Sequence, residues 1–196
     1  MRLLLALLAW LPLQALGGNQ IYEPLADSVR QRLSAQVADK AVPELHFRTP
    51  EEGNRWLNAM EHRLASRIPD RKQRLELLRT VHYEATRARL DPQLVLGVIE
   101  IESGFRKYAV SRSGARGYMQ VMPFWTGLIG TSKQNLFHMR TNIAYGCAIL
   151  RHYLDVERGD YFRALGRYNG SVGKPEYPNL VLSAWKGRWK YDGPTA

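Results

Sequence analysis

Hydrophobic positions recur with a helical period in the stretch that follows residue 48. Thr49-Pro50-Glu51-Glu52 combines a capping residue, a proline at the first helical position and a glutamate three residues after the cap. This pattern predicts a helix whose apolar face carries Trp56, Leu57, Met60 and Leu64. After Pro69-Asp70, a second helical pattern over residues 71–90 has an inward face formed by Leu75, Leu78, Val81, His82 and Ala85.

Asp91-Pro92 repeats the signal of a cap followed by proline and opens the most apolar segment, residues 94–102. Its length and its cap favour a buried helix over a strand. Residues 103–123 are punctuated by glycine and serine, which indicates turns, and we expect them to lead into a short helix at residues 118–122.

The second half of the chain continues with helices. One is expected to begin at Thr141 or Asn142, with an inward face of Ile143, Gly146, Cys147, Leu150 and Leu154. Asp160 is suited to cap another, which runs to Tyr168 and ends at Asn169-Gly170-Ser171. Residues 19–43 are expected to be partly helical, and no strand pattern is found. The prediction is an all-α fold in which five to seven helices surround one core.

The N-terminus has the layout of a secretory signal. A basic start is followed by the apolar run at residues 3–11, Pro12 and the small-residue stretch at residues 15–18. We expect residues 1–18 to be this signal, with an uncleaved N-terminal anchor as the alternative. Either form places the protein outside the cytosol, in the periplasm or the cell envelope.

The formal net charge is +10, which suits nucleic acid, an anionic membrane or an acidic extracellular polymer as a partner. Export disfavours nucleic acid, and it favours cell-wall glycan, whose peptide carboxylates would be attracted. Cys147 is the single cysteine, so an intrachain disulfide and a cysteine-based zinc site are excluded.

Glu102 is the residue with the strongest chemical signal. It closes the apolar segment and is followed at once by Ser103-Gly104. Burial would raise the pKa of this carboxyl group, which suits an acid that must hold its proton near neutral pH. Glu100 has a similar setting, but its side chain diverges by about 200° on a helix, and only Glu102 adjoins the turn that would open a cleft. The alternative is that both carboxylates pair with arginines.

The stretch from Ser103 to Leu154 contains no Asp or Glu, whereas it contains seven Lys or Arg residues. It therefore offers no carboxylate cluster for a hard metal ion. A glycosidase that uses two carboxylates would have to recruit the second from elsewhere in the chain. We expect single-carboxylate chemistry with no metal and no cofactor.

Four motifs occur in one order: residues 102–105 (Glu-Ser-Gly-Phe), residues 114–120 (Gly-Ala-Arg-Gly-Tyr-Met-Gln), Asn142-Ile143 with Gly146, and residues 168–171 (Tyr-Asn-Gly-Ser). Together they closely resemble the catalytic domain of the soluble lytic transglycosylases of family 1, over about residues 90–171. The resemblance implies a lysozyme-like fold. It divides the chain into the signal at 1–18, an N-terminal helical segment at 19–89 and a catalytic domain with a C-terminal tail at 90–196.

The resemblance also implies a reaction. Glu102 aligns with the lone catalytic glutamate of that family. It would protonate the oxygen between N-acetylmuramic acid and N-acetylglucosamine and then, as a carboxylate, deprotonate the muramyl C6 hydroxyl. The product is a 1,6-anhydro sugar, and peptidoglycan glycan strands are the expected partner.

Further site residues follow from the same resemblance. Ser111 and Ser113 would donate hydrogen bonds to a carboxylate or to substrate, or else form local turns. Met119 and Gln120 would line the cleft, with a core role as the alternative for Met119. The Tyr168 hydroxyl would bond Glu102, unless this tyrosine is purely structural, and Asn169 would hold loop and substrate. Tyr118 departs from the usual leucine.

Three competing functions stay open at this point. One is a hydrolytic muramidase of the goose-lysozyme kind, and another is a non-catalytic wall-binding or assembly protein. A nucleic-acid binder is the third, and the leader argues against it. We expect a monomer that is able to associate with membrane or cell-envelope machinery.

Overall fold

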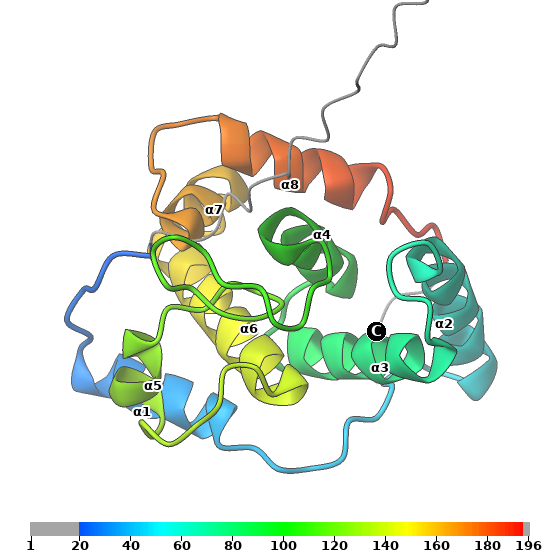
Figure 1. The fold of residues 1–196 in the computed structure, drawn as a ribbon, viewed down its shortest axis with the longest axis horizontal. Coiled ribbons are helices and arrows are strands. Elements are labelled where there is room, and N and C mark those ends of the chain that lie inside the picture. The colour runs from blue at the N-terminus through cyan, green and yellow to red at the C-terminus, as the bar shows by residue number, and fades with distance from the viewer. Residues whose placement is uncertain (1–19, 194–196) are drawn as a thin grey trace, which may run out of the picture.

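The computed structural model describes residues 20–193, and within them the fold is built of α-helices. The helices are α1 (Asp27–Val37), α2 (Pro50–Leu64), α3 (Arg71–Arg87), α4 (Pro92–Ser103), α5 (Phe124–Ile129), α6 (Met139–Val156), α7 (Tyr161–Asn169) and α8 (Glu176–Lys186). Figure 1 shows α4 near the centre of the view. In that view α8 lies above α4, α7 to its left, α3 below it and α2 to its right. Two isolated β-bridges, Val110 to Arg116 and Arg116 to Val121, are the extended pairings in the described part.

Side-chain caps fix the starts of α2, α3, α4 and α7, whereas α6, expected to begin at Thr141 or Asn142, begins at Met139 without a side-chain cap. The Thr49 hydroxyl accepts from the Glu52 amide at 3.3 Å, and the Asp91 carboxylate accepts from the Gln93 amide at 2.7 Å. Asp70 and Asp160 cap α3 and α7 in the same way. The helix starts expected at residues 49, 91 and 160 are therefore confirmed.

Helix α4 is the buried centre of the fold. Every residue from Pro92 to Ser103 except Ile101 is buried. Its closest partner is α8, and Gly97 lies where an added methyl group would come within 3.4 Å of the Val181 carbonyl oxygen. The small residue therefore allows the two helices to pack closely.

The prediction of a short helix at residues 118–122 is wrong. These residues form a turn that ends in a β-bridge, and α5 begins later, at Phe124. The backbone enters and leaves the turn in the left-handed region, with φ of +77° at Gly117 and +48° at Gln120. A right-handed helix excludes both conformations.

The C-terminal part also differs from expectation, because α8 was not predicted there. Two prolines obscured it: Pro175 is the cap residue and Pro178 lies in the first turn, where a missing amide costs no helical hydrogen bond. With α8 and the short α5, residues 20–193 hold eight helices, more than the five to seven expected.

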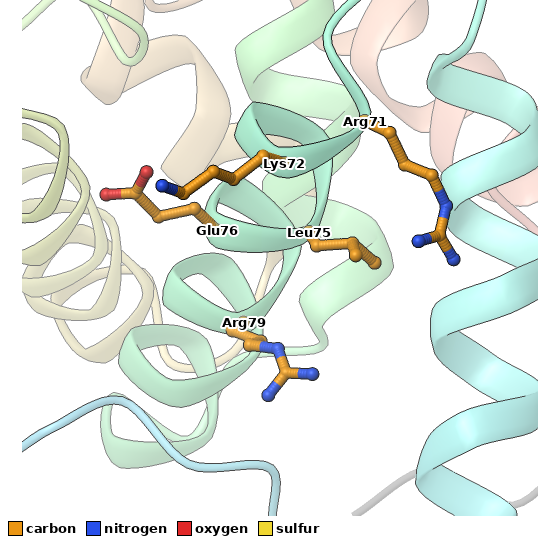
Figure 2. Close-up of a pocket in the computed structure, with 5 residues that line it drawn as sticks. All are labelled: Arg71, Lys72, Leu75, Glu76 and Arg79. Carbon is orange, nitrogen blue, oxygen red and sulfur yellow. The ribbon is translucent and has the colours of Figure 1, made fainter.

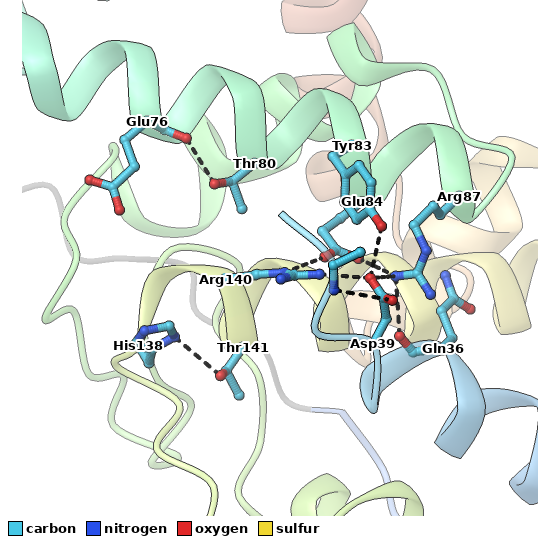
Figure 3. Close-up of polar contacts among 11 residues, drawn as sticks. Gln36, Asp39, Glu76, Thr80, Tyr83, Glu84, Arg87, His138, Arg140 and Thr141 are labelled. Carbon is cyan, nitrogen blue, oxygen red and sulfur yellow. Dashed lines mark hydrogen bonds and ion pairs between the residues drawn. The ribbon is translucent and has the colours of Figure 1, made fainter. Parts of the chain in front are cut away.

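The N-terminal helices are part of the same core. A polar cluster connects the segment that follows α1 both with α3 and with α6 (Figure 3). Arg140 on α6 donates to Asp39 at 2.7 Å and to Glu84 at 3.0 Å. On α3, Tyr83 donates to Asp39 at 2.9 Å and Arg87 donates to Glu84 at 2.9 Å.

No helix between residues 20 and 193 is both long and apolar enough to cross a membrane. The signal expected at residues 1–18 lies outside the described residues.

Candidate active site

Glu102 lies in the last turn of α4 and is completely buried. The helix ends directly after it, because Gly104 takes a left-handed conformation with φ of +57°. The Tyr177 hydroxyl, from α8, donates a hydrogen bond to Glu102 Oε1 at 2.7 Å. A buried carboxyl group therefore sits at the junction of α4, α8 and the loop that follows α4.

Glu100 has a different environment, although it is only two residues away. Its carboxylate accepts from the Arg67 guanidinium at 2.6 Å and from the Trp189 indole at 2.7 Å, and Arg188 forms a further ion pair with it. Glu100 thus connects α4 with the residues that follow α2 and with the C-terminal residues. For Glu100, this is the pairing with arginines that the sequence analysis gave as the alternative to a catalytic role.

Two tyrosine hydroxyls lie near Glu102. The hydroxyl of Tyr168, on α7, donates to the Met119 carbonyl oxygen at 2.7 Å. Burial, and next the nearby Glu102 charge, raise the pKa of both Tyr168 and Tyr177 well above the ordinary value. Both phenols therefore stay protonated and act as donors. Tyr177 donates to Glu102, and the hydroxyl of Tyr168, for which the resemblance implied such a bond, donates to the Met119 carbonyl oxygen.

Polar side chains hold the loop after α4 in place through hydrogen bonds to its main-chain carbonyl groups. The Ser103 hydroxyl bonds the Tyr118 carbonyl oxygen at 2.8 Å. Gln120 is fully buried, and its amide nitrogen donates to the carbonyl oxygens of Ala109 at 3.1 Å and Gly117 at 3.0 Å. Gln120 therefore holds two parts of this loop together.

Asn142, at the start of α6, fixes the other side of the loop. Its amide nitrogen donates to the carbonyl oxygens of Arg116 at 2.7 Å and Leu136 at 2.9 Å, and its oxygen accepts from the Met119 amide at 2.7 Å. The Met119 side chain is fully buried and packs on Gly146, where an added methyl group would come within 2.3 Å of its sulfur. This placement is that of a core methionine.

The remaining predicted residues lie on the turn and at the end of α7. The Ser111 hydroxyl accepts a hydrogen bond from the Ala115 amide at 3.1 Å. Ser111 therefore forms a local turn, which was the alternative to a substrate contact. Ser113 is exposed on the same turn, and Asn169 is half-buried as the last residue of α7.

Sequence reasoning missed two residues at this site. Tyr177 stands beyond the last motif, in the proline-containing segment whose helix was not predicted. Gln20 is 4% exposed, and its side-chain oxygen accepts from the Met122 amide at 3.2 Å. It lies in a polar stretch with no periodic pattern, so only the tertiary structure places it here.

Two open hollows are found elsewhere on the surface. The larger, about 430 Å³, is lined by five side chains of α3 (Figure 2). In that view, Arg71, Leu75 and Arg79 point to one side of the helix, whereas Lys72 and Glu76 point to the other. The second, about 340 Å³, lies beside Asp91 and Trp185. Glu102 lines neither hollow, and residues 20–193 contain no grouping of His, Cys, Asp and Glu able to hold a metal ion.

Comparison with known proteins gives consistent relatives. A 34% identical match over 115 residues, covering 55% of this chain and 42% of the relative, is the "Transglycosylase" of Enterobacteria phage PRD1. The "Membrane-bound lytic murein transglycosylase C" of Histophilus somni (strain 2336) is 34% identical over 131 residues, covering 56% of this chain and 34% of that protein. The chain thus spans less than half the length of these curated relatives.

A solved structure also matches: an inactive mutant of the lytic transglycosylase Slt from Pseudomonas aeruginosa, with 25% identity and a TM-score of 0.42. The match covers 58% of this chain and 20% of that chain.

The family model described as the transglycosylase SLT domain matches residues 79–176. The match begins inside α3 and ends at the first residue of α8, so it contains Glu102, the loop of Gln120, and Tyr168. With the helical architecture, it confirms the predicted fold class, an all-α lysozyme-like domain, and the resemblance seen in the motifs. The chain belongs to the transglycosylase SLT domain family.

Proposed function

We propose that this protein is a lytic transglycosylase that cleaves the β-1,4 bond between N-acetylmuramic acid and N-acetylglucosamine in peptidoglycan without using water. The observation that carries the proposal is the Glu102 carboxyl group, fully buried at the end of α4 with the Tyr177 hydroxyl at 2.7 Å. Family membership supplies the reaction class.

In the first step, Glu102 acts as the acid. Burial favours the neutral form of a carboxyl group, so Glu102 can carry a proton into the reaction. This proton passes to the glycosidic oxygen while the bond from that oxygen to muramyl C1 breaks. The N-acetylglucosamine end departs with a hydroxyl group, and positive charge develops at C1.

In the second step, Glu102 acts as the base. The carboxylate takes the proton of the muramyl C6 hydroxyl, and O6 forms a bond to C1, which closes the 1,6-anhydro ring. The proton is thereby returned to Glu102, so no water is consumed. Between the steps, Tyr177 stabilises the carboxylate by donating its hydrogen bond.

The surrounding residues have supporting roles in this proposal. Gln120 and Tyr168 hold the loop against the site through their bonds to main-chain carbonyl groups. Ser113 and Asn169 are the proposed contacts to the glycan, and Ser111 shapes the turn that presents Ser113. Met119 supports the site by packing against α6.

The hydrolytic alternative uses the same acid but attacks C1 with water. The two reactions give different products, because a hydrolysed strand ends in a reducing sugar, whereas an anhydro end is lighter by one water and resists borohydride reduction. We expect mass spectrometry of digested sacculi to show anhydro ends. Reducing ends alone would establish a muramidase instead.

A Glu102→Gln variant tests the catalytic proposal against a non-catalytic wall-binding role. General acid catalysis contributes about 10²–10⁴-fold to a rate, and the variant loses both proton-transfer steps. We expect no detectable release of soluble fragments from sacculi. If the variant clears sacculi as fast as the parent does, Glu102 is not the acid and the proposal fails.

We further propose that residues 1–18 direct export, and that the protein acts in the periplasm or the cell envelope as a monomer that can associate with envelope machinery. The relatives described as membrane-bound murein transglycosylases support an envelope location. Fractionation of cells that express the complete chain tests this, since cytosolic recovery of the uncleaved chain would contradict export.

A further inference from the structure

An aromatic pair joins the loop that follows α4 to the segment that precedes α6. Tyr108 is 71% exposed, and its ring lies 5.9 Å from that of Phe137, at an interplanar angle of 50°. Phe137 lies two residues before the start of α6 and is half-buried. The exposure of Tyr108 leaves most of its ring accessible to a ligand.

Two cationic side chains flank this pair. The Lys107 ammonium group lies 5.4 Å from the centre of the Tyr108 ring, and the Arg116 guanidinium group lies 5.9 Å from the centre of the Phe137 ring. Among residues 20–193, no carboxylate lies within ion-pair distance, 4.0 Å, of either group. The pair therefore presents apolar rings together with positive charge that no acidic side chain neutralises.

The position of this group connects it to the proposed active site. The Gly117 amide, next to Arg116, donates to the Ala109 carbonyl oxygen at 2.9 Å, and Ala109 follows Tyr108. Gln120 bonds that same carbonyl oxygen and so joins this part of the loop to the turn that carries Met119. Tyr108 therefore lies on the same hydrogen-bonded loop that begins directly after α4, the helix that carries Glu102.

We propose that Lys107, Tyr108, Arg116 and Phe137, here named the outer subsite, bind a distal part of the peptidoglycan strand. This inference rests on the proposed function. The rings would stack against the apolar face of a sugar, and the two cations would pair with the carboxylates of the peptide attached to it. A ligand that carries both a sugar and a peptide carboxylate therefore matches the outer subsite, which has aromatic rings for the first and unpaired cations for the second.

Binding of the Glu102→Gln protein to two substrates tests the outer subsite: intact peptide-bearing strands, and strands from which an amidase has removed the peptides. We expect Tyr108→Ala with Phe137→Ala to weaken binding to both by about tenfold, because the sugar contact is lost. We expect Lys107→Gln with Arg116→Gln to weaken binding to the peptide-bearing strands much more than to the stripped strands, which keep one carboxylate, on the lactyl group of each muramyl sugar. The matched control, Lys40→Gln with Arg48→Gln, removes the same charge from two exposed residues before α2 and should bind as the parent does.

The outcomes separate this inference from the proposed function. If the parent enzyme releases anhydro fragments but both double variants bind as tightly as Glu102→Gln alone, the outer subsite is wrong and the proposed function stands. If the charge variant weakens binding to stripped strands equally, or the control variant weakens binding as much, the peptide carboxylate is not the ligand. A parent that releases no fragments refutes the proposed function itself. Thermal unfolding of each variant measures whether the substitutions leave the fold intact.

Discussion

At the scale of single residues, two glutamates only two positions apart on α4 have different partners and therefore different roles. Glu100 pairs with Arg67 and Arg188, which gives it a structural role, whereas Glu102 receives a hydrogen bond from Tyr177. The structure adds Tyr177 to the site as a positioning residue, because its hydroxyl contacts the proposed catalytic carboxyl group.

We predict that Tyr177→Phe lowers kcat by about 10- to 100-fold with little change in KM. A hydrogen bond to a charged group contributes about 1.5–3 kcal/mol, and this one is strongest when Glu102 is a carboxylate. The basic limb of the pH–rate profile, where Glu102 loses the proton that it must donate, should also move to higher pH, since the lost donor favoured the charged form. Tyr161→Phe is the matched control, because its ring packs on Trp185 away from Glu102. Equal effects of the two variants would contradict a specific role for Tyr177.

A second residue-scale prediction concerns His82, whose ring is fully buried between Phe47, at 4.6 Å, and Trp56, at 5.1 Å. Burial, and next the charge of His46, lower the pKa of His82 to about 4 from 6.5. Because the unfolded chain binds the proton more readily, stability should fall as pH drops from 6.5 towards 4. The loss should reach about 3 kcal/mol at most.

Urea unfolding at pH 7 and pH 4.5 measures this effect. We expect His82→Phe to lose less stability than the parent over this pH interval, whereas His138→Gln, which changes an exposed histidine, should behave as the parent does. The same pH dependence in the parent and in His82→Phe would show that other groups cause the acid sensitivity.

At the scale of elements, the site depends on close packing between α6 and the loop before α5. Gly146 provides the space for Met119, and Met119 in turn accepts the Tyr168 hydrogen bond through its carbonyl group. One small residue on a helix thus helps to position the turn and α7 together.

We predict that Gly146→Ala destabilises the protein by about 1–3 kcal/mol, because the new methyl group would overlap Met119. The added methyl group would lie 2.7 Å from Met119 Cβ, so rotation of the Met119 side chain alone does not relieve the overlap. Gly127→Ala is the control, since an added methyl group on α5 has no atom within 4 Å there. Differential scanning calorimetry should show a lower Tm for the first variant and an unchanged or higher Tm for the second. An unchanged Tm for both would show that the loop adapts freely.

At the scale of the whole molecule, the helices before residue 90 share one hydrophobic core with the rest. Trp56 and Leu64 on α2 and Leu77, Leu78 and Val81 on α3 all belong to this core and are essentially inaccessible to solvent. The cluster of Asp39 with Arg140 adds a polar connection between the segment after α1 and α6.

We therefore predict that a protein beginning at residue 90 does not unfold cooperatively, whereas one beginning at residue 20 does. Removing α1 to α3 would expose the apolar surfaces of α4 and α6 that α3 covers, and burial of such side chains contributes about 1.5–3 kcal/mol each. Circular dichroism melting compares the two proteins. A sharp transition at an unchanged Tm in the shorter protein would show that residues 20–89 are dispensable for folding.

The sequence alone was sufficient to predict local features. Caps at Thr49, Asp91 and Asp160 identified three helix starts, because side-chain capping depends on neighbouring residues only. The all-α class followed from hydrophobic periodicity, and the prediction that Glu102 is the acid followed from its place between an apolar helix and a glycine turn.

Contacts between distant residues were decided only by the tertiary structure. The donor to Glu102 comes from α8, 75 residues further along the chain, and no local pattern records that proximity. The Gln120 turn replaced the expected short helix because its backbone takes the left-handed conformation, which its bonds to Ala109 and Gly117 hold in place. The sequence by itself thus determined the helices and the chemistry available, whereas packing of α8 and the loop against α4 decided which side chains meet that carboxyl group.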